Sequence, residues 1–128
     1  MLLTFTKPQF KCLIKEGVKQ HTIREDKNNR WKVGTKIHFW LGNPRNTRGK
    51  NKPHQFGTGV CCKVVPISIY PKNGAIIYDG YGLSMSEIED LAINDGFESW
   101  EDMKTFFTED FVGKMIFWKD CVWSYDFR

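Results

Sequence analysis

Residues 17–24 read Gly-Val-Lys-Gln-His-Thr-Ile-Arg, and this stretch decides how the first part of the chain folds. Upstream, Pro8 can open a helix because its missing N–H costs nothing in the first turn. Apolar residues then follow at helical spacing until Gly17 ends the helix. Downstream, the β-branched pair Thr22 and Ile23 favours a strand. The stretch is therefore predicted to be the turn between a helix and a strand.

The polar side chains of this turn and strand form a candidate site. In a regular strand Thr22 and Arg24 share one face, whereas Lys19 would point to the other side. Lys19 can join them only from a turn, where Gly17 gives the backbone that freedom. His21 alternates with Thr22, so we expect it to face the opposite side and to be structural or exposed.

The pattern Gly17-x-Lys19-x-x-Thr22-x-Arg24 resembles the signature of the ASCH domain family, whose members have a small β-barrel related to the PUA RNA-binding domain. Other segments follow the order of that family: an opening strand at 3–5, a turn at 31–34 leading into a strand at 37–40, and a closing strand at 111–116. The resemblance covers most of the 128 residues. It implies an α+β fold, a PUA-like β-barrel of about six strands with two or three short helices, in a single domain spanning 1–128.

The segments between these landmarks predict further strands and two helices. Residues 56–70 alternate like a strand that Pro66 interrupts, which indicates a bulge or an edge, and 75–78 form another short strand. Ser84 and Glu87 make a capping box for a helix that ends at the Asp95-Gly96 turn. A second short helix begins near Ser99 and is expected to bury its apolar side, which consists of Trp100, Met103, Phe106 and Phe107.

Residues 119–128 predict a strand-like extension at the C-terminus. Trp123, Tyr125 and Phe127 alternate there with Val122, Ser124 and Asp126. Such a strand covers either an edge of the barrel or a partner, so we also consider a weak homodimer formed through it.

The net charge of +4 conceals a difference between the two halves of the chain. Residues 1–63 carry 14 Lys and Arg against 3 Asp and Glu (+11), whereas residues 64–128 carry 5 against 12 (−7). Part of the basic excess lies in a predicted loop insertion at 44–53, which is bounded by prolines and lacks apolar periodicity. A solvated insertion without a partner and an arm that contacts phosphates explain this loop equally well. Its candidate nucleic-acid contacts are Arg45, Arg48, Lys50 and Lys52.

The resemblance also extends to bacterial acetylcytidine amidohydrolases of the ASCH family, and it implies a catalytic set. Lys19 and Thr22 match the lysine and threonine of that set. Aligning residues 92–97 places Asp95 at the position of its glutamate, one methylene shorter, and Glu98 stays open as a substitute. From sequence alone, Thr22 is also an ordinary β-former and Asp95 an ordinary turn residue.

Two functions therefore stay open. The first is a small hydrolase of an acylated nucleoside, in which desolvation and the Arg24 cation lower the pKa of Lys19 so that it serves as base or nucleophile. Arg24, Trp31 and Trp40 are its candidate substrate-binding residues, with Arg24 stabilising an oxyanion. The second is a non-catalytic RNA-binding module whose pocket grips a phosphate or a flipped base, with Trp31, Trp40 or Phe56 available for stacking.

Other classes of function find no support in the sequence. No spacing of histidine, cysteine or carboxylate side chains indicates a metal site, and we expect neither a metal nor another cofactor. No apolar run approaches the ~18 residues of a membrane span, and the N-terminus lacks the apolar stretch of a signal peptide. We therefore expect a cytoplasmic protein whose partner is a modified nucleoside or RNA and which does not bind membranes.

Overall fold

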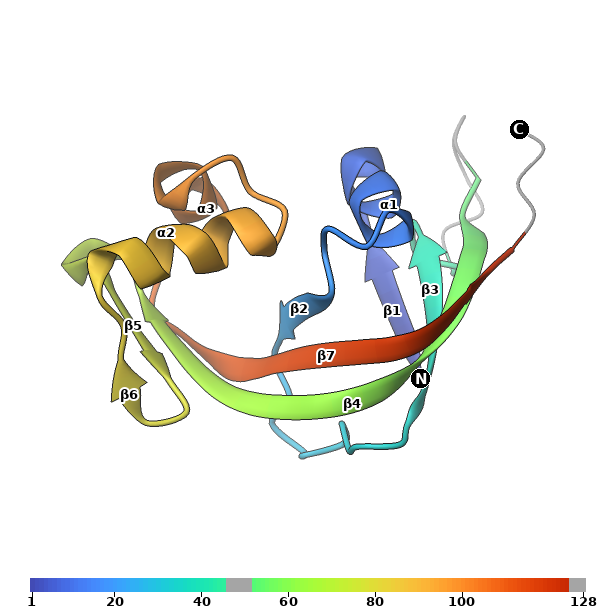
Figure 1. Ribbon diagram of the computed structural model, residues 1–128, viewed down its shortest axis with the longest axis horizontal. Helices are drawn as coiled ribbons and strands as arrows, with labels where there is room; N and C mark the ends of the chain where they lie inside the picture. Colours follow the sequence, from blue (N-terminus) through green and yellow to red (C-terminus); the bar gives the residue numbers. More distant parts are fainter. Residues whose placement is uncertain (46–51, 125–128) are drawn as a thin grey trace.

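The computed structural model describes residues 1–45 and 52–124, which fold as one mixed seven-stranded sheet with three α-helices and a short 3-10 helix, an α+β arrangement (Figure 1). The elements in chain order are β1 (Leu2–Phe5), α1 (Pro8–Lys15), β2 (His21–Arg24), β3 (Lys36–Leu41), β4 (His54–Tyr70), η1 (Pro71–Asn73), β5 (Ala75–Tyr78), β6 (Tyr81–Gly82), α2 (Met85–Asn94), α3 (Trp100–Phe106) and β7 (Phe111–Trp123). No helix within the described residues is long and apolar enough to cross a membrane.

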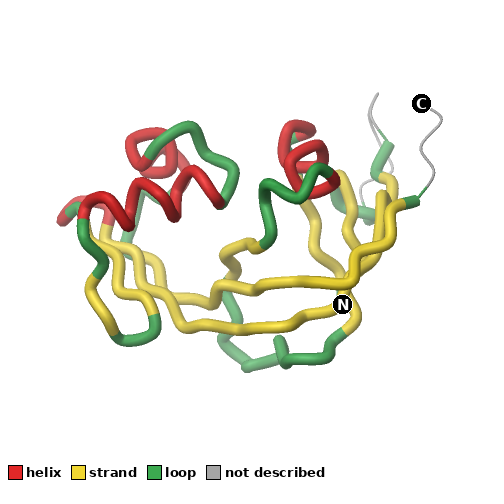
Figure 2. Tube along the Cα trace, in the orientation of Figure 1, coloured by secondary structure: helices red, strands yellow, loops and turns green. Residues whose placement is uncertain are grey.

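Two long antiparallel strands, β4 and β7, run the length of the molecule and organise the sheet (Figure 2). On the other edge of β4, β3 pairs with its first part and β5 with its last part. β1 lies parallel to β3, and β2 lies antiparallel to β7. Among the described residues these pairings leave β1, β2 and β6 with one neighbour each, so the sheet is not closed and the expected barrel is not confirmed.

The helices begin and end where local signals predict. Pro8 occupies the first turn of α1, and Gly17 follows the helix with a φ of +80°. In α2 the Ser84 hydroxyl accepts from the backbone N–H of Glu87, and the Glu87 carboxylate accepts from the backbone N–H of Ser84. Ser99 caps α3 in the same way through the N–H of Asp102. Local sequence therefore determines the limits of these helices.

The prediction of the buried side of α3 is wrong for one of its four residues. Trp100, Met103 and Phe107 are buried as expected, but Phe106 is 58% exposed. Phe106 is the last residue of the seven-residue helix, and its ring contacts Phe97 at a cavity instead of lying in the core.

Two apolar clusters fill the two ends of the molecule. We call the first the α1 core; it lies between α1 and the end of the sheet that contains β1 and β3 (Figure 1). Its buried members are Leu3, Phe5, Ile14, Trp31, Ile37, Phe39, Phe56, Cys61, Ile116 and Trp118. We call the second the helix-pair core; it lies beneath α2 and α3, and its buried members are Ile23, Val65, Ile67, Ile69, Ile76, Ile88, Leu91, Ala92, Phe97, Trp100, Met103, Phe107 and Met115. Each large side chain buried this way contributes about 1.5–3 kcal/mol to the free energy of folding.

β4 is not interrupted at Pro66. This residue lies on the stretch of the strand between its pairing with β3, which ends at Val60, and its pairing with β5, which begins at Ile67. A proline is tolerated there because that edge of the ladder has no neighbouring strand. Of the two predicted explanations for Pro66, a bulge or an edge, the structure has the edge. The register shifts between β4 and β7 lie earlier in β4, at 58–60 and 61–63.

The predicted C-terminal extension is not a separate strand. Residues 119–123 continue β7, and they pair with the first part of β4, with Gly57 opposite Trp123. Asp120 has a φ of +53° and lies next to the register shift at 58–60, so β7 continues through a local irregularity at this point. Tyr125 and Phe127 lie outside the described residues, as do Arg48 and Lys50 of the basic loop.

Candidate active site

The turn after α1 places Lys19 inside the molecule. The backbone N–H groups of Val18 and Lys19 both donate to the carbonyl of Leu13, and Gly17 supplies the left-handed conformation that this tight exit requires. The Lys19 side chain is only 1% exposed. Lys19 therefore enters the site from a turn, as predicted.

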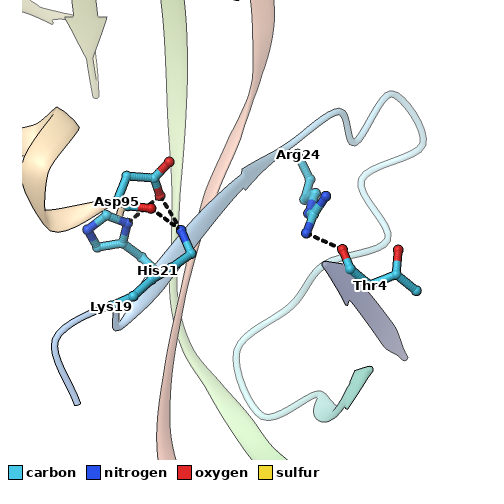
Figure 3. Close-up of polar contacts among 5 residues, drawn as sticks. All are labelled: Thr4, Lys19, His21, Arg24 and Asp95. Atoms are coloured by element: carbon cyan, nitrogen blue, oxygen red, sulfur yellow. Dashed lines mark hydrogen bonds and ion pairs between the residues drawn. The ribbon is translucent and has the colours of Figure 1, made fainter. Parts of the chain in front are cut away.

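Asp95 meets Lys19 from the opposite half of the chain. It is the C-terminal cap of α2, and its side chain is buried beside the lysine (Figure 3). The Lys19 Nζ donates to the Asp95 carboxylate oxygen Oδ1 at 2.8 Å and to the Asp95 backbone carbonyl at 2.5 Å. Glu98, the alternative acid, is exposed and its backbone N–H is directed to Asp102. Of the two carboxylates, Asp95 is the one that reaches the lysine.

His21 belongs to the same cluster, which the sequence interpretation missed. It is buried, and its Nδ1 lies 3.0 Å from Oδ1 of Asp95, so this ring nitrogen donates to the carboxylate (Figure 3). The alternation that separates Lys19 from Thr22 also puts Lys19 and His21 on one side of the chain, two residues apart. This two-residue spacing is the feature of the sequence from which His21 could have been grouped with Lys19.

Thr22 and Arg24 complete the site from β2. Thr22 is buried, and within the described residues its hydroxyl forms no hydrogen bond. Arg24 donates from Nη2 to the carbonyl of Thr4 at 2.7 Å, and its guanidinium lies 5.0 Å from the centre of the Phe5 ring. Its Nε is buried and has no hydrogen-bond partner in the described part of the chain. In the described part of the chain, Thr22 and Arg24 thus each contribute a polar group without a hydrogen-bond partner.

These side chains surround one cavity of about 260 Å³. Its lining consists of Thr4, Phe5, Thr6, Lys7, Phe10, Lys19, Thr22, Ile23, Arg24, Asp95, Phe97, Phe106 and Phe107. Both halves of the chain contribute to it, so the cavity lies between the α1 core and the helix-pair core. A larger cavity of about 380 Å³, which includes Trp118 and Trp123, also contacts Lys19 but contains neither Thr22 nor Asp95. The cavity of about 260 Å³ is therefore the candidate active site, because it contains Lys19, Thr22 and Asp95 together.

Burial dominates the electrostatics of the site. Desolvation lowers the pKa of Lys19 below its ordinary 10.5; the nearby Asp95 carboxylate opposes that shift, and the Arg24 cation adds to it. Desolvation likewise lowers the pKa of Arg24, again opposed by Asp95. A lysine held in this way is closer to its neutral, basic form than a lysine in water.

The structure does not bring the two predicted tryptophans to this cavity. Trp31 is buried within the α1 core, where its backbone N–H donates to Asp26. Trp40 is half-buried, lies opposite Thr4 in the pairing of β3 with β1, and does not line the cavity. The aromatic rings that line the cavity are phenylalanines: Phe5, Phe10, Phe97, Phe106 and Phe107.

The remaining predicted contacts lie away from the site. Arg45 and Lys52 are exposed at the two described ends of the basic loop. Among residues 1–45 and 52–124, no group of three or more His, Cys, Asp or Glu side chains is arranged to hold a metal ion. No protein-family model, curated protein or solved structure matches this chain. What the site does therefore has to be argued from its own geometry and from the signature residues.

Proposed function

We propose that this chain is a small hydrolase that removes the acyl group from the exocyclic amine of an acylated nucleoside, an acetylcytidine-like amide, and that its fold is a PUA-like ASCH domain. One observation carries the proposal: Lys19, Thr22 and Asp95 line a single cavity although 76 residues separate the lysine from the aspartate. Lys19 and Thr22 are the catalytic residues that the resemblance to the ASCH signature implies, and Asp95 is the residue aligned with the glutamate of that set.

Lys19 is suited to the role of general base. Its two hydrogen bonds to Asp95 engage two N–H bonds, so in the neutral amine the remaining position on Nζ is the lone pair. Asp95 thus orients the amine, and His21 holds the same carboxylate oxygen from its other side. The low pKa that burial gives Lys19 supplies the neutral fraction that a base needs.

The proposed reaction uses Thr22 as nucleophile. Lys19 takes the proton of the Thr22 hydroxyl while Oγ1 forms a bond to the acyl carbon, and the carbonyl becomes an oxyanion. The Nε–H of Arg24 donates to this oxyanion. Lys19 then returns the proton to the exocyclic nitrogen as the C–N bond breaks. Water hydrolyses the acyl-threonine with Lys19 again as base, which releases the carboxylic acid and restores the hydroxyl.

Thr22→Val is the sharpest test because it removes the hydroxyl and keeps the β-branched shape that the strand favours. We expect turnover of acetylcytidine to cytidine, followed by chromatography, to fall at least ~100-fold in this variant. Thr22→Ser should retain a substantial part of the activity because it keeps a hydroxyl at the same position.

Thr58→Val is the matched control, since Thr58 lies in β4 and lines none of the cavities described above. Its turnover should equal that of the unaltered protein. Equal turnover in Thr22→Val would eliminate threonine as the nucleophile and leave water activated by Lys19. No turnover by any form of the protein would reject the hydrolase and favour the RNA-binding module, whose affinity for RNA falls steeply with salt.

A further inference from the structure

The cavity contains more positive charge than its proposed chemistry uses. Three cations line it, Lys7, Lys19 and Arg24, whereas Asp95 is its only acidic lining residue within the described part of the chain. That carboxylate is already shared by Lys19 and His21. No carboxylate of the described residues forms an ion pair with Lys7 or Arg24. The site is therefore electrostatically incomplete, because like charges in a partly desolvated space repel one another.

The three cations are interleaved with aromatic rings in a fixed order. Arg24 and Lys19 both lie over the Phe5 ring, at 5.0 and 6.0 Å from its centre. Lys19 also lies over the Phe10 ring at 5.0 Å, and Lys7 lies over that same ring at 5.7 Å. Lys19 thus shares the Phe5 ring with Arg24 and the Phe10 ring with Lys7.

Lys7 is the cation without an assigned role. Its Nζ also lies 5.6 Å from the centre of the Phe97 ring, and Phe97 in turn contacts Phe106, the exposed ring that lines the cavity. Lys7 is the N-cap residue of α1, and its side chain forms no capping hydrogen bond there. An ammonium beside two apolar rings at the edge of a cavity is suited to a ligand that is both aromatic and anionic.

We propose that the substrate of this site is an acylated nucleoside monophosphate, whose phosphate binds Lys7 while its base stacks against Phe97 and Phe106. This inference rests on the proposed function, since it assigns the acyl group to the end with Arg24, Lys19 and Thr22. The phosphate then binds the cation that shares the Phe10 ring with Lys19, and the acyl group lies near the cation that shares the Phe5 ring with it. A neutral nucleoside would leave Lys7 without a counter-charge.

Binding of unreactive products tests the inference without requiring hydrolysis. Calorimetry at fixed ionic strength compares cytidine with cytidine 5′-monophosphate, and the monophosphate should bind at least about tenfold more tightly, as expected for a charge-assisted hydrogen bond. Lys7→Met keeps the apolar stem and removes the charge, so it should bring the two affinities close to each other. Lys72→Met removes the same charge from an exposed site that lines none of the cavities described, and it should leave the preference unchanged.

The companion measurement separates this inference from the hydrolase. We expect kcat/KM for acetylcytidine 5′-monophosphate to exceed that for acetylcytidine at least about tenfold, through KM, in the unaltered protein but not in Lys7→Met. Hydrolysis of both compounds with equal kcat/KM and equal product affinity would overturn the phosphate site and keep the hydrolase. A Lys7-dependent preference for the monophosphate without any hydrolysis would keep the phosphate site and reject the hydrolase.

Two further ligands define what the site recognises. Inorganic phosphate should bind far more weakly than the monophosphate, because it has no base to stack; equal affinity would show a phosphate site and overturn the nucleotide. A short single-stranded RNA should bind no more tightly than the monophosphate. A much tighter complex would show that an RNA strand, and not a free nucleotide, is the ligand.

Discussion

The two ends of the molecule solve the same packing problem with different side chains. The α1 core is half aromatic, with Phe, Trp and aliphatic residues from β1, β3 and the first part of β4. The helix-pair core is mostly aliphatic and lies beneath α2 and α3. Each end buries its own set of apolar side chains, although β4 and β7 contribute residues to both. What joins them, besides the two long strands, is a small set of contacts around Lys19, Asp95 and Phe10.

The charge of the chain follows the same division. The basic half of the sequence supplies Lys19, Thr22 and Arg24, and the acidic half supplies Asp95. The site exists only where the halves meet, and a buried ion pair there is costly to break because the remaining charge is left without a partner. The link between the halves should therefore be more sensitive to substitution than the surface of either.

The largest effect is expected for Asp95→Ala, which leaves the Lys19 ammonium buried and unpaired. We expect the free energy of unfolding, measured by urea denaturation, to fall by about 3–5 kcal/mol. The double variant Lys19→Met, Asp95→Leu removes both charges and should recover at least half of that loss, although the Asp95 backbone carbonyl loses a donor. A double variant no more stable than Asp95→Ala would show that the cost lies in packing and not in the unpaired charge.

A smaller loss is expected for Gly96→Ala, at the apolar contact between the halves. Gly96 has a φ of +102°, and a Cβ there would lie 2.8 Å from the ring of Phe10, which packs against both cores. Strain and overpacking together should reduce the free energy of unfolding by about 2–3 kcal/mol in the same denaturation experiment. Gly74→Ala is the control for strain alone, since Gly74 also has a positive φ but has open space around it. Equal losses in both variants would mean that the approach of Phe10 contributes nothing.

The pH dependence of stability tests the electrostatic side of the comparison. Folding lowers the pKa of Lys19 below 10.5, so between the lowered pKa and 10.5 the unfolded chain binds more protons than the folded one. The free energy of unfolding therefore rises with pH across that window, and above 10.5 the titration of Lys19 changes it no further. Denaturation at several alkaline pH values should show this rise in the unaltered protein and a flatter curve in the Lys19→Met, Asp95→Leu variant. Parallel curves would place the titration elsewhere.

Short-range signals predicted much of this structure, and contacts between distant elements account for what they missed. The capping box at Ser84 and the turn at Gly17 depend on neighbours within four residues, so the sequence is enough to place them. Phe106 is exposed because the position of α3 over the sheet, and not its own periodicity, decides which face is covered. Trp31 is likewise buried by contacts that its own segment does not reveal, with side chains of distant strands in the α1 core.

The site shows the same limit. That Lys19 leaves a turn beside Thr22 could be predicted from a glycine and from strand alternation, whereas Asp95 was suggested only by a resemblance, because nothing local connects residues 76 positions apart. His21 followed the alternation, and of its two predicted environments, structural or exposed, the structure has the buried one, where its ring contacts Asp95 at the end of α2. The pairing of Thr4 with Arg24 gave no sequence signal at all.

The smallest effect is expected at the surface of the helix-pair end, where Lys72 and Glu109 form an ion pair. Their nitrogen and oxygen lie 3.2 Å apart, a separation close to that of Lys19 and Asp95, but the side chains are 70% and 78% exposed. Water solvates either charge when the other is removed, so Lys72→Met should change the free energy of unfolding by no more than ~0.5 kcal/mol. Raising the salt concentration should reduce even that difference. If Lys72→Met were as destabilising as Asp95→Ala, distance and not burial would govern these pairs, and the distinction drawn between the surface and the junction of the two halves would be lost.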